Sequence, residues 1–445
     1  ARGAKRHYRP SNTGYRPAAD GRGKQRPYQL TGSAHRAIDT HEVSMSTPNL
    51  RDDFLLDPEV VFLNHGSFGA TPQPVFAEYQ RWQRELERQP VEFLGRRSEG
   101  LLDEARAEVA RYLGAEASDL VFVPNATTGV NIVARSLALR PGDEILTTDL
   151  EYGACDRAWE EACRKAGARV IRQPVGLPVG DPATVVEAIW QGVTPRTRVL
   201  YLSHITSGTA LTLPIEPLIQ RAREAGIFTV VDGAHAPGHI PVDLTAIGAD
   251  AYSGNLHKWL CAPKGAGVLH VRREHHDWMG SDIVSWGWVE DNDHFRGDDL
   301  FVSRNSWQGT RDIAAFLAAP AAIRYQAERD WPAVRAVCHA LVAGARRRIG
   351  ALTGLPPATP EPAEADWQWF CQMAIAPLPD VDARELKRRL YDDFRVEVPI
   401  TQRGGTSYVR VSIQGYNTAR DVDALVNALE RLLPEVATGE VHAHQ

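Results

Sequence analysis

Residues 197–238 read TRVLYLSHITSGTALTLPIEPLIQRAREAGIFTVVDGAHAPG, and they contain two apolar segments separated by an amphipathic one. The outer segments, 197–205 and 228–238, are rich in Val, Leu, Ile and Phe, which is typical of buried strands. Between them, residues 214–226 place apolar side chains three and four positions apart, which predicts a helix. A strand, a helix and a second strand in this order indicate a parallel sheet covered by helices.

The same alternation continues along the chain in both directions. Further strands are predicted at 120–125, 144–149 and 169–175 and beside 250–272, and further helices at 127–139, 154–167 and 182–193. A helical pattern fills 73–113, and from about residue 312 onward helices alternate with more amphipathic strands. We therefore predict an α/β fold, with a three-layer α/β/α large domain on a mostly parallel sheet and a smaller α+β domain after it.

The domain boundaries follow from changes in this pattern. They are predicted as 1–44 for an extension, 45–311 for the large domain with an N-terminal arm at 45–72, 312–435 for the small domain, and 436–445 for a flexible tail. The first segment is basic, rich in Gly and Pro, and lacks the apolar core of a secretory signal. We expect a disordered extension, a wrongly assigned start or an expression remnant before Met45, with an organelle transit peptide as the alternative.

Composition narrows the function class. The formal net charge of −6 leaves no basic excess to neutralise phosphates, which argues against a nucleic-acid partner. No apolar run approaches the roughly 20 residues that cross a membrane, so no membrane partner is expected. The five cysteines are odd in number and show no CxxC spacing: Cys155, Cys163, Cys261, Cys338 and Cys371. This pattern indicates free thiols in a reducing cytoplasm and argues against disulfides or a metal site.

The segment DAYSGNLHKWLCAPKGAGVLHVR, residues 250–272, contains a lysine in a chain that mostly uses arginine. Of the 50 Lys and Arg residues only six are lysines. Lys258 lies between apolar strands, where desolvation would lower its pKa and make the amine able to attack a carbonyl. A buried structural ion pair is the alternative interpretation.

Two further stretches place polar residues at predicted strand ends. In VFVPNATTGVN, residues 121–131, a strand is followed by small polar residues that open a helix, which suits either phosphate binding or ordinary N-capping. In VVDGAHAPG, Asp232 could hold a protonated ring nitrogen, bind a metal or cap a turn, and His235 alone is more often a structural histidine. No third metal ligand stands at a suitable spacing.

A phosphate cradle, a strand-end acid and a sheltered lysine together suit pyridoxal phosphate, which carries a phosphate, a basic ring nitrogen and an aldehyde. The ordered motifs FLNHGSFGATP, NATTGVN, EYGA, HITSGTA, VDGAHAPG, GNLHKWLCAPKGAG, GTRD and YVRVSIQGYNT strengthen this interpretation. With them the chain resembles the fold type I pyridoxal-phosphate enzymes of the class V aminotransferase superfamily, over about 54–433. Within that superfamily it is most similar to the isopenicillin N epimerase group.

The resemblance implies roles around the cofactor ring. Lys258 would form the Schiff base, Asp232 would pair with the ring nitrogen, and His235 would lie near the ring hydroxyl. Tyr152 would stack on the ring, although a place in the core is its alternative. Thr206 belongs to a turn whose family counterpart lies near the cofactor.

The resemblance also implies roles at the phosphate and the substrate. The phosphate ligands would be Ala126, Thr127, Asn255 and His257. Asn255 matches the family pattern least well, because relatives often carry Ser or Thr there. Thr310 would reach the phosphate of the neighbouring subunit, which implies a homodimer with shared active sites. Arg410 would bind the substrate carboxylate, or else lie on a solvated strand face. Asn64 and His65 would border the substrate, or else shape a turn.

The sequence leaves several reactions open. The first choice is an amino-acid epimerase similar to the isopenicillin N epimerase group, followed by a C–S lyase acting on a cysteine conjugate or sulfoxide, and then a class V aminotransferase. A non-catalytic relative is disfavoured because Lys258, Asp232 and Arg410 are all present. An epimerase with two bases needs a second acid/base, for which Tyr152, His65 and His235 are candidates.

Two further segments bear on the reaction. A cysteine desulfurase needs a mobile cysteine before the arginine strand, and residues 394–410 contain none. That activity is therefore disfavoured. Trp278, Trp286 and Trp288 indicate either a large, partly apolar substrate or structural packing.

Overall fold

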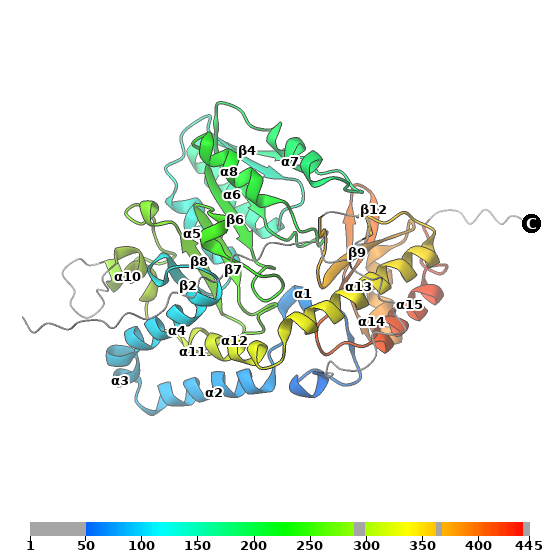
Figure 1. Cartoon of the computed structure of the whole chain (residues 1–445), viewed down its shortest axis with the longest axis horizontal. Coiled ribbons are helices and arrows are strands. Elements are labelled where there is room, and N and C mark those ends of the chain that lie inside the picture. The colour runs from blue at the N-terminus through cyan, green and yellow to red at the C-terminus, as the bar shows by residue number, and fades with distance from the viewer. Residues whose placement is uncertain (1–49, 289–298, 362–366, 439–445) are drawn as a thin grey trace, which may run out of the picture. The chain divides into compact units, whose positions relative to one another are not determined.

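The central element of the fold is a seven-stranded sheet in the order β2-β8-β7-β6-β5-β3-β4 (Figure 1). The computed structural model describes residues 50–288, 299–361 and 367–438. The strands are β2 (Leu120–Val123), β3 (Glu144–Thr148), β4 (Arg169–Gln173), β5 (Thr197–Ser203), β6 (Phe228–Gly233), β7 (Ala251–Asn255) and β8 (Gly267–Val271). Strand β8 runs antiparallel to both of its neighbours, and the other pairs are parallel. The predicted mostly parallel sheet is confirmed.

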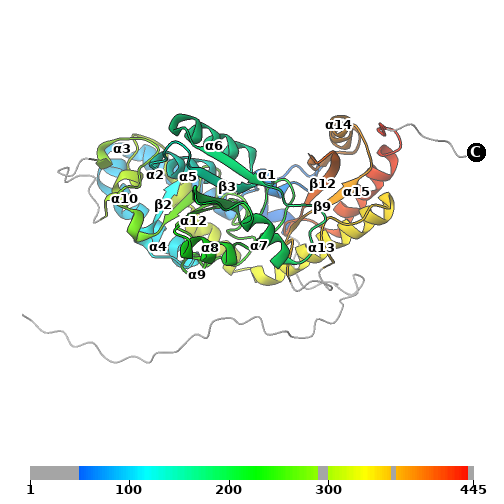
Figure 2. The same ribbon diagram turned by 90° about the horizontal axis from the view of Figure 1, so that it is seen from above.

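Helices cover both faces of this sheet, as the view in Figure 2 shows for α6 on one side and α8 on the other. Along β2, Val121 and Val123 pack against one apolar cluster, while Leu120 and Phe122 pack against a second. Burial of each such side chain stabilises the fold by roughly 1.5–3 kcal/mol. The first face is covered by α5 (Ala126–Ser136), α6 (Gly153–Ala166) and α10 (Leu300–Ser306), and the second by α4 (Ser98–Tyr112), α7 (Pro182–Trp190), α8 (Ile215–Glu224), α11 (Ala314–Leu317) and α12 (Ala319–Ala327). These are the three predicted layers.

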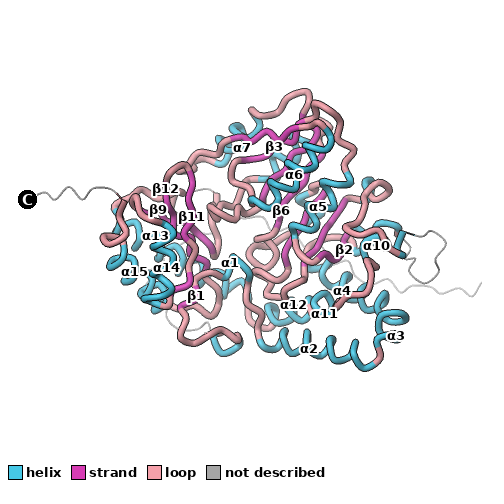
Figure 3. The backbone as a smooth tube through the Cα atoms, turned by 180° about the vertical axis from the view of Figure 1, so that it is seen from behind, coloured by secondary structure: helices cyan, strands magenta, loops and turns pink. Residues whose placement is uncertain are grey.

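A second, antiparallel sheet has the order β11-β12-β9 (Figure 3). Its strands are β9 (Met373–Leu378), β11 (Ile400–Arg403) and β12 (Thr406–Ser412), and its helices are α13 (Trp331–Thr353), α14 (Ala383–Phe394) and α15 (Ala419–Leu432). Both sheets belong to one compact unit. The expected smaller α+β region is thus present, and the fold class is confirmed.

The N-terminal arm joins the two sheets. Strand β1 (Val61–Phe62) pairs with β10 (Val396–Glu397), and α1 (His65–Phe68) follows directly. Gly69 then adopts a φ of +69°, and a Cβ on it would come within 2.0 Å of the carbonyl oxygen of His257. Only glycine fits there, since both the left-handed conformation and the close approach exclude a side chain. The arm therefore lies directly against the segment that carries Lys258.

The remaining elements complete the chain. They are the helices α2 (Gln73–Arg88), α3 (Pro90–Glu92) and α9 (Leu244–Ile247), a π-helical turn at Phe93–Arg97, and 3-10 turns at Arg51–Asp53, Ala117–Asp119, Arg273–His275 and Trp286–Trp288. No helix in the described parts of the chain is long and apolar enough to cross a membrane. The predictions for 1–44 and for most of the C-terminal tail fall outside the described residues.

Candidate active site

A cavity of about 590 Å³ lies at the carboxyl edge of the large sheet. Ser203, Asp232 and Asn255, at or near the ends of β5, β6 and β7, line it together with the start of α5. This edge is where open α/β sheets usually bind ligands. The lining includes these predicted site residues: Ala126, Thr127, Tyr152, Asp232, His235, Asn255, His257 and Lys258. Chain segments separated by more than 100 positions therefore meet at one cavity, as the motifs predicted.

The amine of Lys258 is held by a buried histidine. His235 Nε2 lies 3.0 Å from Lys258 Nζ, and the indole nitrogen of Trp259 donates to His235 Nδ1 at 3.2 Å. In a neutral imidazole that accepts at Nδ1, the proton sits on Nε2, so the lysine amine is the acceptor. Burial lowers the pKa of Lys258 to about 8, while Asp232 opposes part of this shift. This contact involves the uncharged, nucleophilic form of the amine, which the lowered pKa makes accessible near neutral pH.

Asp232 is a buried carboxylate with three hydrogen-bond donors. Its Oδ1 accepts from the amide of Ala234 at 2.8 Å. Its Oδ2 accepts from the hydroxyl of Tyr201 at 3.3 Å and from the thiol of Cys155 at 3.5 Å. Burial raises the pKa of Asp232, and the three donors together with the positive charge of Lys258 oppose that shift. The donors and Lys258 therefore offset part of the cost of keeping a negative charge buried at the cavity.

The start of α5 forms an anion-binding cradle. Asn125 caps the helix by accepting from the amide of Thr128 at 2.9 Å, and Asn255 Oδ1 accepts from the amide of Ala126 at 2.8 Å. His257 Nδ1 donates to the carbonyl oxygen of Ala266 at 3.1 Å, so Nε2 of the neutral ring is left as an acceptor. No described group bonds the amide of Thr127. This helix start therefore combines an N-cap with an amide, that of Thr127, of the kind that binds anions at helix N-termini.

This arrangement corrects part of the prediction for Ala126. Ala126 does line the cavity, but its amide is already bonded to Asn255 and is not free for a phosphate. The bond instead holds the Asn255 carboxamide so that its Nδ2 remains available as a donor. The prediction for Ala126 differs from the structure because Asn255, at the end of β7, bonds its amide. The two residues are far apart in the sequence, so neither segment alone reveals this bond.

Tyr152 lies at the cavity wall and not in the core. It precedes α6 and is 46% exposed. Its neighbour Glu151, which the sequence analysis did not single out, accepts from the Thr148 hydroxyl at 2.6 Å and the Ser203 hydroxyl at 2.5 Å. Burial raises the pKa of Glu151 to about 8, and the nearby charge of Asp232 adds to the shift. Only the spatial proximity of β5 to this loop could have revealed this acid.

Arg410, on β12, is a buried cation surrounded by neutral acceptors. It is 5% exposed, which excludes the solvated-face alternative. Its guanidinium donates to the Ser207 carbonyl at 2.5 Å, to Asn64 Oδ1 at 3.2 Å and to the Ser67 hydroxyl at 2.9 Å. Its Nε has no partner, and no described carboxylate lies within ion-pair distance. Ser67 and Ser207 both line the cavity, so the guanidinium stands directly behind its wall.

His65 lies behind the cavity wall. It is fully buried, with Nε2 at 3.0 Å from the carbonyl oxygen of Lys258 and Nδ1 at 2.9 Å from the hydroxyl of Tyr416. Burial lowers its pKa to about 3, which keeps the ring neutral. The expectation that His65 borders the substrate is therefore wrong, because both ring nitrogens are engaged inside the protein. Asn64 remains close to the substrate side through its bond to Arg410.

Thr206 and Thr310 are absent from the cavity lining. The hydroxyl of Thr206 is buried in its own turn, at 2.7 Å from Thr209 Oγ1 and 2.8 Å from the amide of Leu211. Its neighbours Ile205 and Ser207 face the cavity instead. Thr310 is exposed. A role for Thr310 in a neighbouring subunit stays a prediction.

The tryptophans of the long segment after β8 are also absent from the lining among the described residues. Trp278 packs edge-on against Phe228, with ring centroids 5.5 Å apart. Trp288 lies under the guanidinium of Arg304 and donates to Ser281 at 2.8 Å. Trp286 is 59% exposed. The interpretation that they form the substrate pocket of this chain is therefore corrected, because surface packing accounts for the first two.

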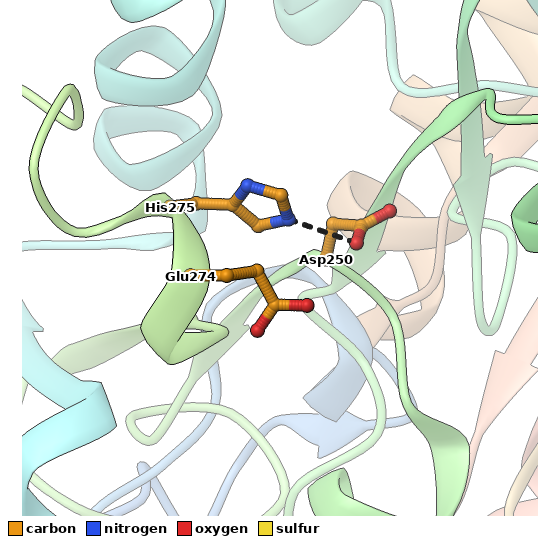
Figure 4. A group of neighbouring side chains, drawn as sticks. All are labelled: Asp250, Glu274 and His275. Atoms are coloured by element: carbon orange, nitrogen blue, oxygen red, sulfur yellow. Dashed lines mark hydrogen bonds and ion pairs between the residues drawn. The ribbon is translucent and has the colours of Figure 1, made fainter.

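One group of side chains away from the cavity has the spacing of metal ligands. Figure 4 shows Asp250, Glu274 and His275, with His275 Nε2 at 3.0 Å from Asp250 Oδ1. Arg272 pairs with both acids, and Asp250 Oδ2 already accepts from the amide and hydroxyl of Thr229 at 2.8 Å. A cation would have to displace the arginine from these acids. We interpret the group as an ion-pair network.

Comparison with known proteins places the chain in a family. The family model of aminotransferase class V matches residues 69–425, and the chain belongs to this family. An isopenicillin N epimerase of Amycolatopsis lactamdurans is 39% identical over 401 residues, which cover 88% of this chain and 99% of that protein. A putative L-cysteine desulfhydrase of Oryza sativa is 29% identical over 84% of both chains. The solved apo structure of a cysteine desulfurase from Thermococcus onnurineus has a TM-score of 0.75 at 23% identity, and covers 88% of this chain and 100% of that one.

Family membership confirms the predicted enzyme class and its cofactor, pyridoxal phosphate. The residues present fit this group. The cavity offers a lysine amine with a lowered pKa for the aldehyde, a buried carboxylate for the ring nitrogen, and a helix amide without a described partner for the phosphate. These three chemistries occur at different places along one cavity lining, as a molecule with three different functional groups requires.

Proposed function

We propose that this enzyme is an amino-acid epimerase in which Lys258 attaches the cofactor and inverts the configuration at Cα. The observation that carries the proposal is the 3.0 Å contact between Lys258 Nζ and the buried His235. It supports an amine that can attack the cofactor and then take a proton from the substrate. The relative at 39% identity, an isopenicillin N epimerase, favours inversion over the other reactions of the family.

The substrate is proposed to bind through Arg410. A buried guanidinium whose Nε lacks a partner favours an incoming carboxylate, which can accept two parallel hydrogen bonds. Asn64 and Ser67 hold the guanidinium in place without neutralising its charge. The substrate class is therefore an amino acid with a free α-carboxylate.

Pyridoxal phosphate, when bound, supplies an electron sink for the negative charge that forms at Cα. We propose that Asp232 would keep the ring nitrogen protonated, and that the Nε2–H of His235 would donate a hydrogen bond to the ring hydroxyl once Lys258 no longer accepts it. Thr127 and Asn255 would donate to the phosphate, and His257 would do so in its protonated form, since Nε2 of the neutral ring is an acceptor. These roles follow from the donors and acceptors that the described side chains leave available.

Inversion needs a second group that returns the proton from the other face of Cα. His65 is engaged inside the protein, and His235 is bonded to Lys258. Tyr152 lines the cavity and bonds neither His65 nor His235. We propose that it is the second acid/base and that it also stacks on the cofactor ring. Its phenol can both donate and accept a proton.

A C–S lyase acting on a cysteine derivative is the second candidate function. The L-cysteine desulfhydrase relative at 29% identity favours it, and the first steps at Cα would be the same. A persulfide-forming desulfurase stays disfavoured, because all five cysteines are buried and the β11–β12 hairpin contains none.

Three further proposals concern the assembly. We propose a homodimer, in which the exposed Thr310 reaches the partner's phosphate site. We propose a cytoplasmic location, because five free buried thiols suit a reducing compartment. We also propose a large and a small domain, in which α11 and α12 pack on the large sheet although they follow the boundary predicted at 311/312. Sedimentation of the wild type and of Thr310→Ala, combined with cofactor affinity, would test the first of these.

The test of the main proposal is α-proton exchange. The enzyme with its cofactor would be incubated with single amino acids in deuterated water, and chiral chromatography, pyruvate and ammonia would be measured together. Deuterium at Cα with both enantiomers formed supports an epimerase. Pyruvate with ammonia supports the lyase, and a keto acid without ammonia supports an aminotransferase.

A further inference from the structure

We propose that Tyr201 and Cys155 are positioning residues that keep Asp232 ionised and aimed at the cofactor's ring nitrogen. This inference rests on the proposed role of Asp232. Neither Tyr201 nor Cys155 lines the cavity. Through Asp232, however, both would control how well the cofactor ring accepts negative charge.

The geometry places both donors on one oxygen. Tyr201, in the middle of β5, and Cys155, in the first turn of α6, approach Asp232 Oδ2 at 3.3 Å and 3.5 Å. The amide of Ala234 occupies Oδ1 at 2.8 Å. Trp159 packs on Tyr201, with ring centroids 5.5 Å apart, and keeps the phenol in place. The carboxylate is thereby fixed on both of its oxygens.

The direction of these bonds is determined by chemistry. A carboxylate only accepts hydrogen bonds, whereas a phenol and a thiol can donate. Burial raises the pKa of Tyr201 and of Cys155, and the negative charge of Asp232 raises both further, so both stay protonated. Hydrogen bonds to the charged form of an acid lower its pKa and oppose the effect of burial. The two donors therefore preserve the charge that the ring nitrogen requires.

The other groups that face Asp232 are unchanged in Tyr201→Phe and Cys155→Ala. The described titratable groups are Lys258, Glu151 and Tyr252, besides Tyr201 and Cys155 themselves. Glu151, whose pKa is about 8, changes charge near neutral pH. Lys258, whose pKa is also about 8, and Glu151 are both present in wild type and variant, so each variant is compared with the wild type at the same pH.

The experiment measures the dissociation constant of pyridoxal phosphate for the full chain at about pH 6 and about pH 8.5. Tyr201→Phe removes one donor with almost no change in volume. Its loss raises the pKa of Asp232, so that a larger fraction of the acid is protonated at the lower pH. We expect affinity to fall about threefold at about pH 8.5 and at least about tenfold at about pH 6. Cys155→Ala is expected to show the same trend with a smaller loss, since its contact is longer.

The matched control is Tyr252→Phe. Tyr252 is also buried, on the adjacent strand β7, and its hydroxyl bonds His204 Nδ1 at 3.0 Å, not Asp232. The ratio of the dissociation constant of pyridoxal phosphate in Tyr252→Phe to that in the wild type should be the same at both pH values. Equal losses for Tyr201→Phe at both pH values, or the same pH dependence in Tyr252→Phe, would overturn the inference. If thermal unfolding shows that Tyr201→Phe is not folded, the test rests on Cys155→Ala. Its loss of cofactor affinity should then be larger at about pH 6 than at about pH 8.5.

Failure of the proposed function gives a different result. If the wild type binds no pyridoxal phosphate at either pH, the role of Asp232 fails. If the wild type binds it and the variants match the wild type at both pH values, only the roles of Tyr201 and Cys155 fail.

Discussion

The two ends of the candidate site differ in how their charged groups are satisfied. At the large sheet, Lys258 bonds His235, and Asp232 accepts from three donors inside the protein. At the small sheet, Arg410 is surrounded by neutral acceptors and its Nε has no partner. The first end is prepared for a reaction with a covalently held cofactor. The second is prepared for a mobile anion that must enter and leave.

The comparison also explains the spacing of the groups along the chain. The cofactor groups come from consecutive strand ends of one sheet, whereas Arg410 is carried by a different sheet and joined through the arm that contains Asn64. Specificity for the substrate can therefore change on the small sheet without disturbing the cofactor site.

The largest effect is expected at Lys258. Lys258→Ala removes the amine that attaches the cofactor and moves the proton, so turnover should fall by at least about 10⁴-fold. The measurement is steady-state kinetics together with the absorbance of the bound cofactor. Lys387→Ala, an exposed lysine on α14, is the control and should retain wild-type turnover. Substantial activity in Lys258→Ala would contradict the interpretation that the large-sheet end of the site attaches the cofactor.

The next effect is expected at Arg410. Arg410→Gln keeps most of the packing but loses the charge, and kcat/KM should fall about 10²- to 10³-fold through a higher KM. Cofactor affinity should change less than about threefold, because Asn64 and Ser67, not the cofactor cradle, hold the guanidinium. Loss of cofactor binding in Arg410→Gln would contradict the interpretation that Arg410 serves the substrate and not the cofactor.

A third effect concerns pH. In cofactor-free protein the Lys258 amine, with a pKa of about 8, must lose its proton before it attacks the aldehyde. The rate of cofactor attachment should therefore rise about tenfold from about pH 6.5 to pH 7.5 and level off above pH 8. Stopped-flow absorbance measures it. A rate that keeps rising to about pH 10 would indicate an ordinary exposed lysine.

The smallest effect is expected at Trp286. This side chain is 59% exposed and does not line the cavity of its own chain. Trp286→Ala should change kcat/KM less than about twofold, unless a partner subunit brings the side chain to a substrate. Kinetics and sedimentation of this variant, measured together, separate the two cases. A large loss of kcat/KM in a protein that stays monomeric would contradict the placement.

Sequence reasoning succeeded where the signal was local. The strand before Asp232 and the helix start after Asn125 are continuous segments whose pattern predicts where the polar residues emerge. It failed where orientation depends on distant packing. Thr206 occupies the expected turn but bonds within it, and His65 follows the expected motif but faces Tyr416 and the Lys258 carbonyl.

The sequence by itself determined the alternation of strands and helices, the family, the cofactor and the identity of the lysine, because these depend on periodicity and on short motifs. Only the tertiary structure decided which donors reach Asp232, which amide at the start of α5 stays available, and that no carboxylate in the described part of the chain pairs with Arg410. These features join β5 to α6, β7 to α5, and the arm to β12. Hydrogen bonds across such distances depend on packing to within a fraction of an ångström, which no local pattern encodes.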